Sequence, residues 1–184
     1  LKDIGRYLKD GTSKTHEKRA KRTYHVIRGK ILNQLSKSKK VQSNFIIRNQ
    51  FHGAVNPQQK QIERTEYIQN IINSDYILCI RGAGNFSYRL YETLSCGRIP
   101  IFINTDCVLP YDFTVNWKKY CVWVEEAEIP HLDEKIRQFH DRLSPETFIQ
   151  LQHDCREFWK TYLSPEGFFK HFHLHLQHIE GNHE

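Results

Sequence analysis

Apolar and polar positions follow two periods along the chain, and together they predict an α/β fold. Short apolar runs rich in β-branched or aromatic residues are typical of buried parallel strands, and they occupy residues 44–48, 76–80, 99–103 and 120–124. Apolar residues at helical spacing predict helices over residues 23–35, 61–73, 86–96, 131–143, 145–163 and 165–179. Strands that alternate with helices favour a Rossmann-like parallel sheet flanked by helices.

Residues 74–103 hold the most informative pattern, in which a strand, a glycine loop, a helix and a second strand follow one another. The loop reads Arg81-Gly82-Ala83-Gly84-Asn85, and its glycines permit backbone angles and close approaches that other residues forbid. Ser87 or Asn85 is a candidate cap for the helix, which Gly97 ends. A glycine loop that leads into a helix N-terminus presents free N–H groups and a positive dipole, so it predicts a phosphate site.

Charged residues around this loop extend the prediction to a nucleotide. Arg81 and Arg89 flank the loop and can make forked contacts with phosphate oxygens. Glu92, further along the same helix, can accept hydrogen bonds from two neighbouring hydroxyls such as those of a ribose. The alternative is an ordinary βαβ unit with a tight turn, because a loose glycine pattern is a weak signal by itself.

The whole string closely resembles the signature of the exostosin family of glycosyltransferases, from about residue 44 to about residue 130. The landmarks that match are Ser74-Asp75, Arg81-Gly82, Gly84, Ser87, Arg89, Glu92, Gly97-Arg98-Ile99-Pro100 and Leu109-Pro110. The chain departs from the commonest form at Ile80, where many relatives have proline. The resemblance implies the C-terminal, donor-binding half of a GT-B glycosyltransferase.

The resemblance also implies a reaction: inverting transfer of a sugar from a nucleotide-sugar donor, UDP-linked, to a hydroxyl of a glycan. No metal cofactor is expected, and no DxD motif stands at a strand end to hold a cation. The catalytic base is expected in an N-terminal domain outside this chain. The expected donor-binding residues are Arg28, Arg81, Gly82, Gly84, Asn85, Ser87, Tyr88, Arg89, Glu92 and Asp106.

Two of these residues have an equally simple structural interpretation. Arg28 lies near the start of a predicted helix and either faces the anion site or is a solvated surface arginine. Asp106 follows a strand at the end where a donor sugar or pyrophosphate binds, but aspartate is also a common turn former. Phe51 and the backbone of Arg48, beyond the strand predicted at 44–48, are candidates to bind the base.

Charge and composition divide the chain unevenly. Residues 1–44 carry 13 Lys/Arg and 3 Asp/Glu, whereas the whole chain of 184 residues has a net charge of +6. We expect a basic, mobile segment at 1–23, a Rossmann-like donor-binding domain at 24–163, and a C-terminal helix and tail at 164–184. The basic segment could attract nucleic acid, an anionic membrane or a phosphorylated substrate, or it could be simply a solvated charge run.

Other clusters of polar residues and the cysteines are better explained by surface or structural roles than by catalysis, metal binding or a disulfide scaffold. Glu125, Glu126 and Glu128 suggest acid/base chemistry but fit a solvated loop better. His171, His175 and His178 have helical metal-ligand spacing, yet no acidic or cysteine partner accompanies them, so a surface histidine cluster is favoured over zinc. Five widely spaced cysteines argue against a disulfide scaffold and favour a reducing compartment, although one bridge stays possible.

Two further functions compete with catalysis. A non-catalytic module that binds a nucleotide or a partner subunit fits a chain that supplies half of an enzyme, and the absence of methionine favours a fragment. Nucleic-acid binding depends on the basic segment alone, without a recognisable motif. No apolar run approaches the ~20 residues of a membrane span. We expect a cytoplasmic or membrane-peripheral protein, or one of the Golgi lumen if it is eukaryotic.

Overall fold

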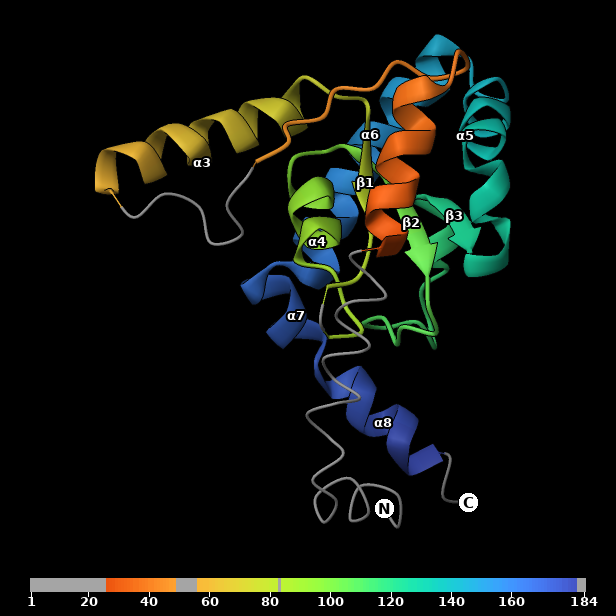
Figure 1. The fold of residues 1–184 in the computed structure, drawn as a ribbon. Helices are drawn as coiled ribbons and strands as arrows, with labels where there is room; N and C mark the ends of the chain where they lie inside the picture. Colours follow the sequence, from red (N-terminus) through yellow and green to blue (C-terminus); the bar gives the residue numbers. More distant parts are fainter. Residues whose placement is uncertain (1–25, 49–55, 83, 182–184) are drawn as a thin grey trace, which may run out of the picture.

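A three-stranded parallel sheet forms the centre of the computed structural model, which describes residues 26–48, 56–82 and 84–181 (Figure 1). The sheet has the order β1-β2-β3, with β1 at Tyr76–Cys79, β2 at Ile99–Asn104 and β3 at Val122–Glu125. Cys79 lies opposite Phe102, and Ile103 lies opposite Val124. Every side chain of β2 up to Ile103 is buried, as expected for a central parallel strand. The predicted α/β class is confirmed.

Helices occupy most of the remaining chain. Of the described residues, 26–37 form one helix. The helices that follow are α3 (Pro57–Ile72), α4 (Tyr88–Ser95), α5 (Leu132–His140), α6 (Pro145–Phe158), α7 (Pro165–His171) and α8 (His173–Gly181). Short 3₁₀ turns precede β3 and α5, at Trp117–Lys119 and Glu126–His131.

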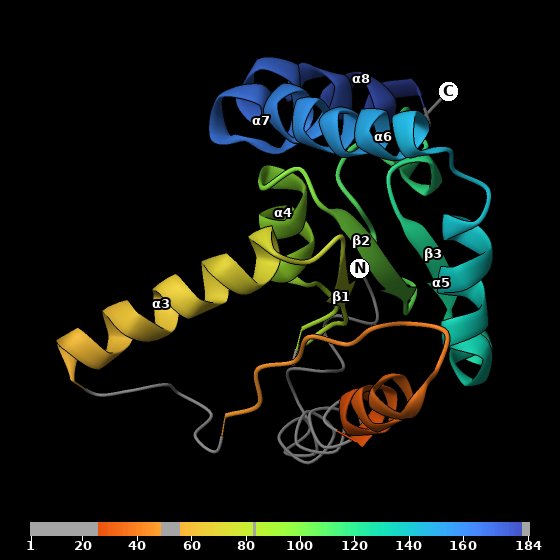
Figure 2. The same ribbon diagram turned by 90° about the horizontal axis from the view of Figure 1, so that it is seen from above.

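The helices form a layer on each face of the sheet (Figure 2). Leu90 and Leu94 of α4, with Cys155 and Phe158 of α6, belong to the core on one face. The core on the other face includes Ile31 of the 26–37 helix and two residues of α5, which are Leu132 and Ile136. These apolar positions recur every three or four residues, so each helix buries one stripe against the sheet.

The strand predicted at 44–48 is absent, which corrects the sequence interpretation. Residues 42–48 have no regular structure, and the side chain of Ile47 is 78% exposed. The Asn44 carbonyl accepts a hydrogen bond from the Asn70 side chain, and Arg48 forms ion pairs with Glu63 and Glu66 of α3. These contacts draw the segment toward α3. Phe51, the candidate base contact, lies outside the described residues.

Helix boundaries also depart from the pattern in places. Asn56 caps α3 through a bond from the Gln58 N–H, with Pro57 in the first turn, so α3 starts four residues earlier than predicted. Gly97 adopts a φ of 61° just after α4, as a helix-terminating glycine does. The helix predicted at 165–179 is broken at Phe172 into α7 and α8. No helix of the described residues is long and apolar enough to cross a membrane.

Candidate functional site

The glycine loop follows β1 at the carboxyl edge of the sheet and provides open space at Gly82. A Cβ placed on Gly82 would meet nothing within 4 Å, and the Gly82 N–H is bonded to the Phe86 carbonyl at 3.3 Å. Gly84 instead packs against the Phe86 ring. Among the described residues the only glycine with positive φ is Gly97. The described glycines of the loop therefore supply room for a ligand and for a ring, and not the unusual backbone angles that we expected.

Asn85 connects the glycine loop to the loop that follows β2. Its amide donates to the carbonyls of Thr105 at 3.0 Å and Asp106 at 2.9 Å, and the Thr105 hydroxyl donates to its Oδ1 at 2.8 Å. The predicted capping role of Asn85 is therefore wrong, because its side chain holds two loops together. Ser87 occupies the N-cap position of α4 but makes no capping hydrogen bond, so its side chain leaves the N–H groups of the first turn available.

Two arginines from distant parts of the chain converge near the end of β1. Arg28 of the 26–37 helix donates to the Ile80 carbonyl at 3.3 Å. Partial burial, and then the neighbouring charge of Arg89 on α4, lower the pKa of Arg28. A bound anion would relieve this repulsion between like charges, so the pair is suited to phosphate.

Tyr67 of α3 contacts two of the candidate donor-binding residues of α4, Arg89 and Glu92, although no sequence pattern assigns Tyr67 a function. The Arg89 guanidinium lies 4.9 Å from the centre of the Tyr67 ring, and the Tyr67 hydroxyl donates to the Glu92 carboxylate. Burial, followed by this hydrogen bond, raises the pKa of Tyr67 to about 12. Tyr67 follows the apolar spacing of the helix predicted at 61–73, and only the packing of α3 beside α4 reveals the polar contacts of its hydroxyl.

The remaining candidates lie at the edges of this group. Arg81 is half-buried and lies within electrostatic reach of the Cys107 thiol. Tyr88 is 74% exposed and packs edge-to-face against Phe86, with ring centres 5.0 Å apart. Asp106 is exposed and has a φ of 55°, the left-handed conformation that aspartate tolerates in turns. The backbone of Asp106 therefore forms a turn, and its carbonyl accepts a hydrogen bond from the Asn85 side chain.

Two glutamates, at the end of β3 and just after it, have structural partners. Glu125 accepts hydrogen bonds from Trp123 and Asn104, which lower its pKa. Glu128 is bonded to Lys135 and to the Glu125 N–H, and both contacts lower its pKa. A general acid needs a raised pKa, so Glu125 and Glu128 are better described as ionised hydrogen-bond acceptors.

The histidines near the C-terminus contact aromatic rings. His175 lies 4.5 Å from the ring centre of Tyr111, His178 stacks on Phe113 at 4.3 Å, and His171 lies 4.9 Å from Tyr162. Within the described ranges, no three His, Cys, Asp or Glu residues lie close enough together to hold a metal ion.

All five cysteines are free thiols. Burial raises the pKa of the three that lie in the core, Cys79, Cys121 and Cys155. A raised pKa keeps a thiol protonated and unreactive, so these three residues act as small apolar side chains.

A family profile now adds to this geometry: that of the exostosin GT47 domain matches residues 11–139. The chain belongs to the exostosin GT47 family. The match covers the described residues from 26 onwards that build the carboxyl edge of the sheet, including the glycine loop, both converging arginines and the loop after β2.

Curated relatives agree with this assignment. Exostosin-1 of Drosophila melanogaster is 25% identical over 103 residues, which cover 56% of this chain and 13% of the relative. The probable beta-1,4-xylosyltransferase IRX10L of Arabidopsis thaliana is 31% identical over 88 residues, or 48% of this chain and 20% of the relative. A probable glucuronosyltransferase of Oryza sativa is 36% identical over 67 residues, or 36% of this chain and 16% of the relative. The chain thus spans a fifth or less of each of these relatives.

Proposed function

We propose that this chain supplies the donor-binding half of a glycosyltransferase that transfers a sugar from a UDP-sugar to a hydroxyl of a glycan. Membership of the exostosin GT47 family and relatives named as xylosyl- and glucuronosyltransferases support the reaction class. The observation that carries the proposal is the convergence of Arg28 and Arg89 near the end of β1, with the open face of Gly82 on the loop that follows β1.

In this proposal the diphosphate lies between the two arginines and the N-terminus of α4. The acceptor hydroxyl attacks the anomeric carbon, a new C–O bond forms, and the bond to the β-phosphate breaks with its electron pair on the diphosphate. Arg28, Arg81 and Arg89 stabilise that developing charge without a metal ion, together with the Ser87 hydroxyl. Glu92, oriented by Tyr67, binds the ribose. The proton of the acceptor passes to a base that the N-terminal GT-B domain supplies.

The proposed partners are therefore a nucleotide-sugar, a glycan and that N-terminal domain. The cellular compartment is also part of the proposal. The exposed free thiol of Cys96 favours a reducing compartment such as the cytoplasm. The similarity to exostosin-1 favours the Golgi lumen instead if the protein is eukaryotic.

Calorimetric titration of the intact protein with UDP, GDP and ADP tests the proposal. We expect one nucleotide, UDP, to bind equally well with Mg²⁺ and with a chelator. Arg89→Ala should weaken UDP binding by about 10- to 100-fold, because it removes a charge-assisted contact with phosphate. Arg142→Ala, which changes an exposed arginine in the turn after α5, is the matched control and should leave UDP binding unchanged.

The same titration separates the alternatives. UDP binding without turnover of UDP-sugars by the intact protein would indicate a non-catalytic nucleotide-binding module. Failure of all three nucleotides to bind would contradict the proposal. Equal losses in Arg89→Ala and Arg142→Ala would also contradict it, because net charge and not the site would then decide binding.

A further inference from the structure

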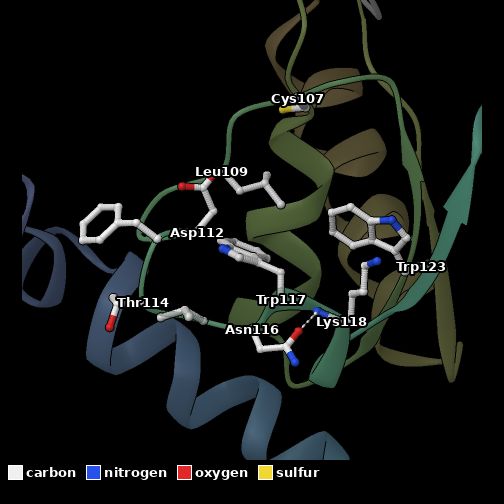
Figure 3. Close-up of a pocket in the computed structure, with 10 residues that line it drawn as sticks. Cys107, Leu109, Asp112, Thr114, Asn116, Trp117, Lys118 and Trp123 are labelled. Carbon is white, nitrogen blue, oxygen red and sulfur yellow. Dashed lines mark hydrogen bonds between the residues drawn. The ribbon is translucent and has the colours of Figure 1, made fainter. Parts of the chain in front are cut away.

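An open cavity of about 420 Å³ lies beside β3 and is bordered by the loop of residues 107–118 (Figure 3). Its volume falls within the range of small-molecule sites. The aromatic residues in its lining are Phe113, Trp117 and Trp123, and the charged residues are Asp112 and Lys118. The expected donor-binding residues do not line it, so it is a second candidate site.

The Trp123 side of the cavity is held in a fixed position. The indole N–H donates to Glu125 Oε1 at 2.6 Å, and Glu125 Oε2 accepts from Asn104 at 2.8 Å. The Phe102 ring packs against the indole with the centres 4.9 Å apart. Trp123 remains half-buried. A partly exposed aromatic ring whose orientation is already fixed loses little entropy when a ligand packs on it.

Charged groups lie on two sides of the cavity. In Figure 3, Asp112 lies on the side opposite Trp123, while the Lys118 side chain lies next to the indole. The Lys118 ammonium is 5.4 Å from the indole centre. A sugar ring has apolar C–H faces that pack on aromatic rings and hydroxyls that bond to carboxylate and ammonium groups. The combination in this cavity suits such an amphipathic ring better than a purely apolar ligand.

The loop keeps its shape through a buried anchor. Tyr111 has a φ of 58°, which is unfavourable for a bulky residue, and its side chain is fully buried. Its hydroxyl donates to the Phe168 carbonyl of α7 at 2.7 Å, and its ring packs on Tyr162. Strained backbone persists only where the surroundings impose it, and it gathers at functional sites. The 107–118 loop is therefore a preformed wall.

The cavity also borders the proposed diphosphate site. Cys107 lines the cavity and lies within electrostatic reach of both Arg81 and Asp112. The glycine loop is joined to this edge of the cavity, because the Asn85 amide donates to the carbonyl of Asp106, the residue before Cys107, at 2.9 Å. In a nucleotide-sugar the sugar is joined to the terminal phosphate, and the acceptor must approach that same sugar. A sugar-binding cavity is expected at this position.

We propose that the cavity between the 107–118 loop and Trp123 binds a sugar ring, supplied either by the donor or by the acceptor glycan. This inference rests on the proposed function, because it assigns a substrate to space that adjoins the nucleotide site. Trp123 provides the stacking surface, and Asp112 accepts hydrogen bonds from the hydroxyls of the sugar.

Titration of the intact protein with three kinds of probe tests the assignment. The probes are UDP, the donors UDP-xylose and UDP-glucuronate, and the acceptor mimic xylotetraose. The variants are Asp112→Asn, which changes an exposed side chain, and Trp123→Leu, with circular dichroism to check folding. Asp154→Asn on α6 is the matched control.

We expect both variants to weaken binding of UDP-sugars or of xylotetraose at least about tenfold, while UDP binding changes by less than about twofold. A loss confined to UDP-sugars would assign the cavity to the donor sugar, and a loss confined to xylotetraose would assign it to the acceptor. Unchanged sugar binding in Asp112→Asn, or no binding of any sugar probe, would overturn the inference even if UDP binds. Failure of UDP to bind the unaltered protein would contradict the proposed function instead.

Discussion

The glycine loop and the 107–118 loop lie next to each other but differ in how firmly their side chains hold them in place. The glycine loop is open at Gly82, and the cations near it come from separate elements, with Arg28 on the 26–37 helix and Arg89 on α4. The 107–118 loop is anchored by two aromatic residues, since Tyr111 bonds to the Phe168 carbonyl and the Trp117 indole donates to the Pro110 carbonyl at 2.9 Å.

The difference follows from what each region is proposed to bind. Charge acts over several ångströms, so long arginine side chains from distant elements can serve one phosphate without a rigid wall. Packing against a ring acts only at contact distance, so a sugar site needs walls that are already in place. The Asn85 side chain connects the two loops, because it bonds the glycine loop to Thr105 and Asp106, just before the 107–118 loop.

Gly82→Ala should have the largest effect and acts on the glycine loop alone. The added methyl meets no protein atom within 4 Å, so the fold should be retained, but it fills the space that the proposed phosphate occupies. We expect UDP binding to fall at least about tenfold, with xylotetraose binding unchanged.

Gly29→Ala is the control for Gly82→Ala, because a Cβ there also meets nothing and the residue lies in the 26–37 helix. It should keep UDP binding and stabilise the protein by about 0.5–1 kcal/mol. Unchanged UDP affinity in Gly82→Ala would place the nucleotide elsewhere.

Asn85→Ala should affect both regions, because it removes the side chain that joins them. The loss leaves the Thr105 hydroxyl and two carbonyls without their partner, and we expect a stability loss of about 1–2 kcal/mol in chemical unfolding. Binding of UDP and binding of the sugar probes should both weaken several-fold. Thr114→Ala, which changes an exposed residue of the 107–118 loop, serves as the comparison. An effect of Asn85→Ala on one ligand class alone would show that the two loops act independently.

Tyr67→Phe should have the smallest effect on binding. It removes the hydrogen bond to Glu92 but keeps the ring beneath Arg89, so UDP binding should weaken about two- to fivefold. Tyr76→Phe, which removes a hydroxyl bonded to His140 at the start of β1, is the control and should bind UDP normally. A loss as large as that of Arg89→Ala would mean that Tyr67 contacts the nucleotide directly.

The pH dependence of stability gives a second measurement at Tyr67. Its pKa is raised from 10.0 to about 12, so its contribution to folding is complete below pH 10 and is lost as the pH rises through about 12. Unfolding at a series of alkaline pH values should therefore show a steeper loss of stability for the unaltered protein than for Tyr67→Phe. Equal slopes would contradict the raised pKa.

The sequence predicted the strands at 76–80 and 99–103 and the helix between them because their signals are local. Arg28 was left as either an anion-site residue or a solvated surface arginine, and the structure brings it close enough to Arg89 for their charges to interact. Other positions failed for equally physical reasons. Residues 44–48 have the apolar pattern of a strand, yet Arg48 is drawn to Glu63 and Glu66, and a strand forms only where a neighbouring strand provides hydrogen bonds.

The sequence by itself determined the α/β class, the three strands, the βαβ unit with its glycine loop and the resemblance to one family. These features depend on the spacing of apolar residues and on loop residues that are close together in the chain. Only the tertiary structure decided that Tyr67 reaches Glu92, that Asn85 joins two loops, and that Trp123 and Asp112 line one cavity. Each of these contacts joins residues from separate segments of the chain. Such pairs are chosen by how helices and loops pack on the sheet, which no local pattern specifies.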